Sequence, residues 1–319
     1  MLRRILFATI CLVGCGPVLR AQEGGGGYRL RVDSHLVETN VLVRDSQGNL
    51  VTRLPQEAFH ITEDGAEQQI RYFASRRELP LSVGILVDAS GSQETFVKTH
   101  EKEIRLFLKS ILEPRDKVFA LCFGNHLRLT SDWTSDPDAV LDGIRRFNKG
   151  DRDFPELAVL PQGDERELGT ALYDAIYTGV EEKLSTETGR RKVLVVFSDG
   201  EENSSEHDLL DAIEAAQNAN VLVYSLRSAE LHHGSLNARS RYGQRALNHL
   251  ADETGGSSFD VQSTKVEADF ASIAADLQSI YELGYYSTNK VRDRRFRKVT
   301  IQVEGEGYRV RARSGYTPR

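Results

Sequence analysis

Oxygen-bearing side chains at three places in the sequence have the types and spacing to bind a metal ion. Asp88, Ser90 and Ser92 stand at alternate positions, with a glycine between the two serines that eases a bend. Thr170 follows a glycine, and Asp199 precedes one. Carboxylates and hydroxyls are hard donors, which suit Mg²⁺, Mn²⁺ or Ca²⁺ and disfavour zinc or copper. The pattern predicts a divalent-cation site.

Each of these groups also has an ordinary structural alternative. A single Asp-x-Ser-x-Ser arises by chance, and its serines could cap the first amides of a helix. Thr170 could be such a cap too, and Asp199 before a glycine could form a plain turn. The metal interpretation is favoured because all three segments fall at predicted strand–helix junctions, in order along the chain.

The elements that must position these groups alternate between strand and helix. Residues 81–87 (LSVGILV) form a near-continuous apolar run, typical of a strand buried on both faces of a parallel sheet. The fold class is therefore α/β, a doubly wound, mostly parallel sheet, in which ligands bind beyond the carboxyl ends of the strands. Further strands are expected at 118–123, 193–197 and 221–226, and helices at 104–112, 139–147, 171–184, 209–219, 245–253 and 270–280.

The sequence on either side of this region is β-type. Residues 28–73 contain short strands and turns without a helical period, and residues 296–303 and 308–312 alternate around a glycine turn as a hairpin. A lone hairpin is unstable, so we expect it to join the N-terminal strands, which makes the α/β domain an insertion in one small β domain. The predicted divisions are 1–22 (signal peptide), 23–27 (glycine tether), 28–78 (first β part), 79–284 (α/β domain) and 285–319 (second β part).

The N-terminus has the pattern of an export signal. Arg3 and Arg4 precede the apolar run 5–13, which is too short to span a bilayer. Two processing outcomes stay open: a lipoprotein-type cleavage that leaves Cys15 lipidated, or cleavage after Ala21. Both place the working protein outside the cytoplasm, in the periplasm, on the envelope or secreted. No later segment is apolar enough to span a membrane.

The net charge and the cysteine content limit the classes of partner and of metal ligand that we expect. The net charge of −6 makes a nucleic-acid partner improbable on electrostatic grounds, because phosphates require a basic face. The basic run 292–298 (RDRRFRK) is interpreted as a solvated turn and strand face. Cys122, the one thiol far from the signal, stands in an apolar strand and is expected to be an inert core residue.

The three metal-binding segments together resemble the metal-ion-dependent adhesion site of von Willebrand factor type A domains. The stretches LPLSVGILVD, GTALYDA, LADETGG and LGYYSTN are similar to a bacterial subgroup called VWFA-related, and the similarity covers roughly residues 28–316. One departure is Ser287, where that subgroup usually has proline; it lies far from the metal motifs in sequence.

The resemblance implies a role for each residue. Ser90, Ser92 and Thr170 would be direct ligands through their hydroxyls, and Asp88 and Asp199 would hold the ion largely through waters or hydrogen bonds. Mg²⁺ is the first expectation, with Mn²⁺ and Ca²⁺ open. An Asp or Glu of a protein partner would complete the coordination, so the implied function is a metal-dependent protein-binding module in the cell envelope.

Two other functions stay open, a structural scaffold of an envelope complex and a metal-dependent hydrolase. The sequence has no Walker loop, no His-Glu-x-x-His and no Gly-x-Ser-x-Gly, and no histidine is placed to activate the serines. We therefore expect no enzymatic activity.

Weaker candidates surround the site. Asp174 is expected to be a surface or capping residue rather than a support of the ion, and Glu201 and Glu202 to lie in a solvated loop. The pair His232-His233 is expected to be exposed, since adjacent histidines are badly placed to bind one metal ion. The long loop 149–168 flanks Thr170, and we expect it to shape the choice of partner.

Overall fold

The computed structural model describes residues 36–75, 79–89, 91–124, 126–157, 170–227, 236–261, 266–291 and 293–318, and of residues 91–97, 99 and 100 it describes the backbone alone. All of them belong to one compact unit, His35–Arg319. Several predictions fall outside the described residues: the export signal with Cys15, the tether, Ser90, the pair His232-His233, and 158–168 of the long loop.

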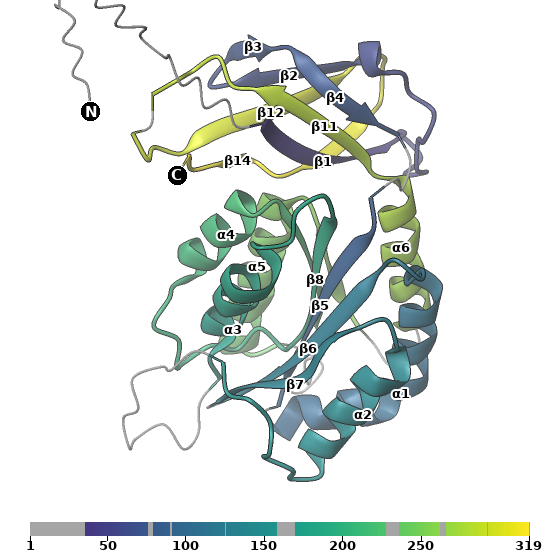
Figure 1. Ribbon diagram of the computed structural model, residues 1–319, viewed down its shortest axis with the longest axis vertical. Helices are drawn as coiled ribbons and strands as arrows, with labels where there is room; N and C mark the ends of the chain where they lie inside the picture. Colours follow the sequence, from purple (N-terminus) through teal and green to yellow (C-terminus); the bar gives the residue numbers. More distant parts are fainter. Residues whose placement is uncertain are drawn as a thin grey trace, which may run out of the picture. The chain divides into compact units, whose positions relative to one another are not determined.

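A six-stranded sheet forms the centre of the larger part of the molecule, in the order β10-β9-β8-β5-β6-β7 (Figure 1). All its pairs are parallel except β6 with β7. The prediction of a mostly parallel sheet is confirmed. β7 and β10 were not predicted, because both are edge strands with too many polar residues to form an apolar run. The strands are β5 (Leu81–Asp88), β6 (Lys117–Phe123), β7 (Leu127–Thr134), β8 (Arg191–Phe197), β9 (Val221–Arg227) and β10 (Ser257–Asp260).

Helices cover both faces of this sheet, as predicted. Alternate residues of β5 enter two separate apolar cores, Val83 and Ile85 on one face and Leu86 on the other. We call this sheet with its helices the α/β core. One face carries α1 (Gly91–Ile111), α2 (Pro137–Asn148) and α6 (Val266–Ser279); the other carries α3 (Leu172–Thr178) with the π-helical turn η2 (Gly179–Leu184), α4 (Leu209–Asn218) and α5 (Ala238–Thr254).

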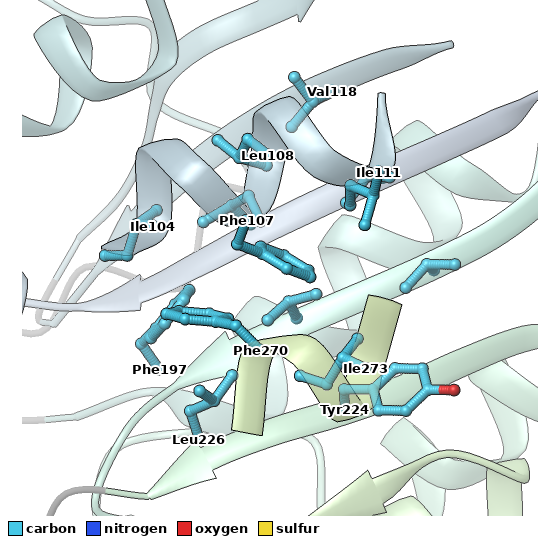
Figure 2. Close-up of a cluster of buried hydrophobic side chains, with 14 of the residues drawn as sticks. Ile104, Phe107, Leu108, Ile111, Val118, Phe197, Tyr224, Leu226, Phe270 and Ile273 are labelled. Carbon is cyan, nitrogen blue, oxygen red and sulfur yellow. The ribbon is translucent and has the colours of Figure 1, made fainter. Parts of the chain in front are cut away.

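Aromatic packing seats α1 and α6 against the strands. Phe107 of α1 stacks on Phe270 of α6 with ring centroids 4.7 Å apart, and Phe270 also contacts Phe197 of β8 (Figure 2). The helix expected from residue 104 begins already at Gly91, because its first turns are polar and carry no apolar stripe. Ser92 therefore lies in the first turn of α1.

The remaining strands form two four-stranded antiparallel sheets, which we call the β unit (Figure 1). Apolar side chains such as Val41, Ile61 and Leu283 form its core. The chain leaves this unit after β4 and returns in β11, so the predicted insertion is confirmed. One sheet has the order β13-β1-β11-β4 and the other β14-β12-β2-β3. The elements are β1 (Leu36–Arg44), η1 (Gln56–Ala58), β2 (Phe59–Glu63), β3 (Ala66–Gln68), β4 (Ile70–Ala74), β11 (Tyr281–Tyr286), β12 (Arg297–Val303), β13 (Arg309–Ala312) and β14 (Gly315–Tyr316).

The predicted C-terminal hairpin is wrong. β12 pairs with β2 and β14, whereas β13 pairs with β1 in the other sheet. Each strand completes a larger sheet and buries more apolar surface there than a two-stranded hairpin offers. The domain boundaries stay predictions. Since β11 pairs with β1 and β4, we propose that the β unit resumes at Tyr281.

Buried charges join the β unit to the α/β core. Arg191, the first residue of β8, donates through Nε to Glu282 of β11 at 2.9 Å and through Nη1 to the carbonyl of Leu277 at 2.6 Å. The Asp276 carboxylate of α6 binds Arg44 of β1 and Arg311 of β13. These side chains are largely withdrawn from water, so each charge depends on its partner.

We predict that removing one partner of the pair Arg191–Glu282 destabilises the protein more than removing both partners. Arg191→Met alone leaves a buried carboxylate unpaired and should lower the free energy of unfolding by about 3–5 kcal/mol. The double variant Arg191→Met/Glu282→Leu removes both charges and should recover most of that loss. Urea unfolding of the wild type and both variants measures this, and a double variant no more stable than the single one contradicts it.

Candidate metal centre

Asp88 ends β5 and is fully buried beside the end of β8. The hydroxyl of Ser198, at the matching position just past β8, donates to Oδ2 of Asp88 at 2.9 Å. The same hydroxyl oxygen accepts the amide of Gly200 at 3.0 Å. Ser198 therefore orients one oxygen of Asp88. The sequence analysis gave Ser198 no such role, although its place at the end of a strand next to Asp199 was the available signal.

Backbone hydrogen bonds to the end of β6 bring Thr170 to the same edge. The amide of Ala89, just past β5, donates to the carbonyl of Phe123 at 2.7 Å. The amide of Ala171 donates to the next carbonyl, that of Gly124, at 3.2 Å. The segments that carry the β5 carboxylate and Thr170 are thus tied to consecutive peptide groups.

The loop after β8 holds Thr170 from the other side. The amide of Thr170 donates to Oδ1 of Asn203 at 2.8 Å, and the amide of Asn203 donates to the carbonyl of Thr170 at 3.2 Å. Asp199 opens this loop and is half-buried. Its Oδ1 accepts the amide of Glu201 at 2.9 Å, so the turn considered for Asp199 exists and uses one of its oxygens.

Thr170 is not the cap of α3. The first amides of that helix, at residues 172–174, donate to the carboxylate of Glu202 and the hydroxyl of Ser205 at 2.5–3.3 Å. Ala171 occupies the capping position and its side chain makes no capping bond. A negative carboxylate at a helix N-terminus is electrostatically favourable. Glu202 thus does the capping that the sequence would have allowed Thr170 to do.

Asp174 is neither a surface residue nor a cap of its own helix. It is buried, and its oxygens accept the amides of Glu206 and His207 at 2.9 and 3.0 Å. The His207 ring lies 2.7 Å away through Nδ1 and stacks on Tyr177 with centroids 3.8 Å apart. Asp174 and Glu202 together clamp α3 to the loop that begins with Asp199.

Helix α5 packs backbone to backbone on the same loop. A Cβ at either Gly200 or Gly243 would lie 2.6 Å from the other's backbone, and Gly200 has a φ of +80°. Both positions therefore require glycine. One turn earlier on α5, Ser240 donates to Glu201 at 3.3 Å, and Arg239 lies 3.6 Å from Glu201. Glu201 is thus a contact of α5 rather than a purely solvated residue.

The described residues thus bring Asp88, Thr170 and Asp199 to one edge of the sheet. Ser90 lies outside the described residues, and Ser92 is placed by its backbone only, in the first turn of α1. Their two carboxylates and one hydroxyl are oxygen donors, the kind that a hard divalent cation prefers.

Two smaller expectations concern the thiol and the membrane. Cys122 is buried in β6, and burial raises the pKa of its thiol to about 12, so it is the inert core residue expected. In the described part of the chain, no helix combines the length and apolar character needed to cross a membrane.

Comparison with known proteins identifies the family to which this architecture corresponds. Residues 82–279, from the second residue of β5 to the end of α6, match the von Willebrand factor type A domain. No curated protein sequence matches the chain.

Three solved structures illustrate the likeness. An aerotolerance-related membrane protein from Bacteroides fragilis is 20% identical (TM-score 0.45; 62% of this chain and 98% of that one covered). The von Willebrand factor domain of the type V pili tip protein Mfa5 from Porphyromonas gingivalis is 14% identical (TM-score 0.45; 63% and 95%). Proximal thread matrix protein 1 from the mussel byssus was solved with zinc in its MIDAS motif, the metal-ion-dependent adhesion site. It is 12% identical (TM-score 0.43; 64% and 49%), so this chain spans about half of it.

The matched segment contains all of the α/β core except Leu81, and it contains the candidate metal centre. Domains of this kind mediate protein–protein interaction. With the fold and the match in agreement, the chain belongs to the von Willebrand factor type A domain family.

Proposed function

We propose that this protein captures an acidic residue of a protein partner through a divalent cation held at the edge of the sheet, outside the cytoplasm. The observation that carries the proposal is the convergence of Asp88, Thr170 and Asp199. Their segments are held by hydrogen bonds of the backbone and of Ser198, Asn203 and Glu202. The Thr170 hydroxyl is therefore not used to cap α3, because Glu202 and Ser205 accept the first amides of that helix. A group that is already in position loses little entropy when it binds an ion.

Each residue has a proposed role. Ser90, Ser92 and Thr170 supply hydroxyl oxygens directly to the ion. Asp88 and Asp199 supply negative charge, directly or through waters, and Ser198 holds Asp88 in place. Mg²⁺ is the ion we favour, with Mn²⁺ or Ca²⁺ as the other candidates. An ion with few direct carboxylates remains electrophilic, which suits it to accept one more carboxylate from a partner.

The rim beside Asp199 offers further contacts to such a partner. Tyr242 of α5 is 60% exposed and directly precedes Gly243, whose backbone touches the Asp199 loop. The side chain of Arg239 is 64% exposed one turn earlier on the same helix. An aromatic residue and an arginine beside a bound cation suit an acidic surface, and these two residue types dominate interface energetics.

The N-terminal segment supports export as part of the proposal. Arg3, Arg4 and the apolar run 5–13 have the form of a signal, with lipidation at Cys15 or cleavage after Ala21 as the two outcomes. The buried thiol of Cys122 does not compete for the proposed ion.

We predict that Asp88→Ala and Thr170→Ala each weaken Mg²⁺ binding by about 10- to 100-fold, because each removes a group that contacts or orients around the ion. Titration calorimetry with Mg²⁺, Mn²⁺ and Ca²⁺ measures the change, with zinc, the ion of the mussel protein, as a competitor. Asp142→Ala, which changes an exposed carboxylate of α2, is the matched control and should bind Mg²⁺ like the wild type. Unchanged affinity in both site variants contradicts the proposal.

The same variants test partner capture. Wild type should retain an envelope protein in Mg²⁺ and release it in EDTA, and Asp88→Ala should fail to retain it. If chelation lowers thermal stability but leaves the complex assembled, the site is structural and the protein is a scaffold. Hydrolysis of ester or phosphate substrates that EDTA abolishes would instead favour an enzyme.

We predict that Tyr242→Ala weakens capture of that partner by about 10-fold or more while leaving the affinity for Mg²⁺ unchanged, because Tyr242 contacts the partner and not the ion. Leu106→Ala, which removes a similarly exposed side chain from α1, is the control and should change neither property. A shift in Mg²⁺ affinity, or full capture by Tyr242→Ala, contradicts this role.

A further inference from the structure

A second surface, far from the metal edge, combines exposed apolar side chains with positive charge. We call it the basic loop: residues 286–291 and 293–298, between β11 and β12. Tyr286, Val291 and Phe296 are 45%, 59% and 50% exposed, three of the six large apolar side chains most open to water in the described part of the chain. Apolar groups gathered on one loop call for an explanation that scattered ones do not.

The charge of this loop is opposite to that of the whole protein. The chain carries −6 overall, whereas the basic loop has four exposed cations and one acidic residue, Asp293, which lies 3.6 Å from Arg295. A second acid at its margin, Asp64, accepts the amide of Lys298 at 2.9 Å. The exposed cations are Lys290, Arg294, Arg295 and Lys298.

A buried arginine holds the loop in shape. Arg297 donates to the hydroxyl of Ser287 at 2.9 Å and to the carbonyl of Asn289 at 2.8 Å, and also to the carbonyl of Val291. Its charge is paired with the buried carboxylate of Glu63 at 3.2 Å. The loop thus presents its apolar side chains from a hydrogen-bonded base, which reduces the entropy lost on docking.

The chain reaches the described structure beside this loop. Leu36, the first residue of β1, lies opposite Tyr286 in the antiparallel pairing of β1 with β11. The first strand of the described structure therefore begins next to the basic loop. The metal edge lies elsewhere: β8 starts at the β unit through Arg191 and ends at the metal centre, seven residues or about 20 Å away.

We propose that the basic loop docks on the surface of an anionic lipid bilayer. Tyr286, Val291 and Phe296 enter the boundary between headgroups and acyl chains, while the cations meet lipid phosphates. Lysine and arginine suit this depth because their stems are apolar and their charges reach the headgroups. A protein held this way keeps the metal edge, at the other end of β8 from the β unit, away from the membrane.

Other occupants fit the loop less well. Two copies of the chain would bring like charges together, which opposes association through this surface. Duplex nucleic acid would use the cations, but its phosphate backbone offers no apolar surface to the three apolar side chains. Lipid surfaces use both.

Vesicle flotation with the full chain tests the proposal. The vesicles are phosphatidylcholine alone or with one quarter phosphatidylglycerol, and every protein carries Cys15→Ser so that lipidation is absent. The N-terminal segment is common to all samples, so only differences between variants are interpreted. The protein with the wild-type loop should partition to the anionic vesicles. Its binding should be weaker in 0.5 M salt, because the screening length is then only about 4 Å.

Two variants separate the contributions. Val291→Ser/Phe296→Ser and Lys290→Gln/Arg295→Gln should each lower partitioning by about 10-fold or more. Leu106→Ser, equally exposed on α1, is the control and should bind like the wild type, and unchanged urea midpoints verify folding. Asp88→Ala should also float like the wild type, so failure here is distinct from failure of the metal proposal. Equal binding to both vesicle types, or wild-type binding by both loop variants, overturns the membrane proposal. The proposal is also overturned if the basic loop binds a second copy of the chain or nucleic acid in preference to the vesicles.

Discussion

Three segments meet at the carboxyl edge of the central sheet because hydrogen bonds tie two of them to the end of β6 and the third to Thr170. Consecutive carbonyls at the end of β6 receive the amides that follow Asp88 and Thr170, and Asn203 grips Thr170 through both its amide and its side chain. This junction depends in turn on the parallel register of β5, β6 and β8, which brings the ends of the three strands level. The rest of the candidate metal centre follows from this convergence.

Supporting roles at the site are separate from ligand roles. Glu202 and Ser205 cap α3, Asp174 holds the turn at His207, and Ser198 orients Asp88. Carboxylates in a site like this repel one another unless each is hydrogen-bonded or faces a cation. Glu202 and Asp174 each accept backbone amides, so their oxygens are engaged in holding α3 and its neighbouring loop. The proposed ligands remain the groups at the edge itself.

The β unit and the α/β core are joined by arginine–carboxylate pairs and not only by apolar contact. Arg191 with Glu282, and Asp276 with Arg44 and Arg311, demand definite partners and directions. Such pairs favour one relative placement over others more strongly than they add stability. The start of β8 thus meets the β unit through Arg191, whereas the candidate metal centre lies at the other end of that strand.

Local sequence was sufficient where one periodicity or one motif carried the information. The apolar run 81–87 determined a buried parallel strand, and Asp88, Thr170 and Asp199 at strand–helix junctions determined a shared edge. It was insufficient where the outcome depended on distant partners. β12 and β13 alternate like a hairpin yet join different sheets, since free edges of β1 and β2 were available to them. Thr170 looked like a cap until Glu202, 32 residues later, took the amides of α3. The sequence by itself thus determined the sheet, the insertion and the residue types at this edge. Only the tertiary structure decided which polar groups hold the segments of this edge in place, because hydrogen-bond partners are determined by position in space and not by position along the chain.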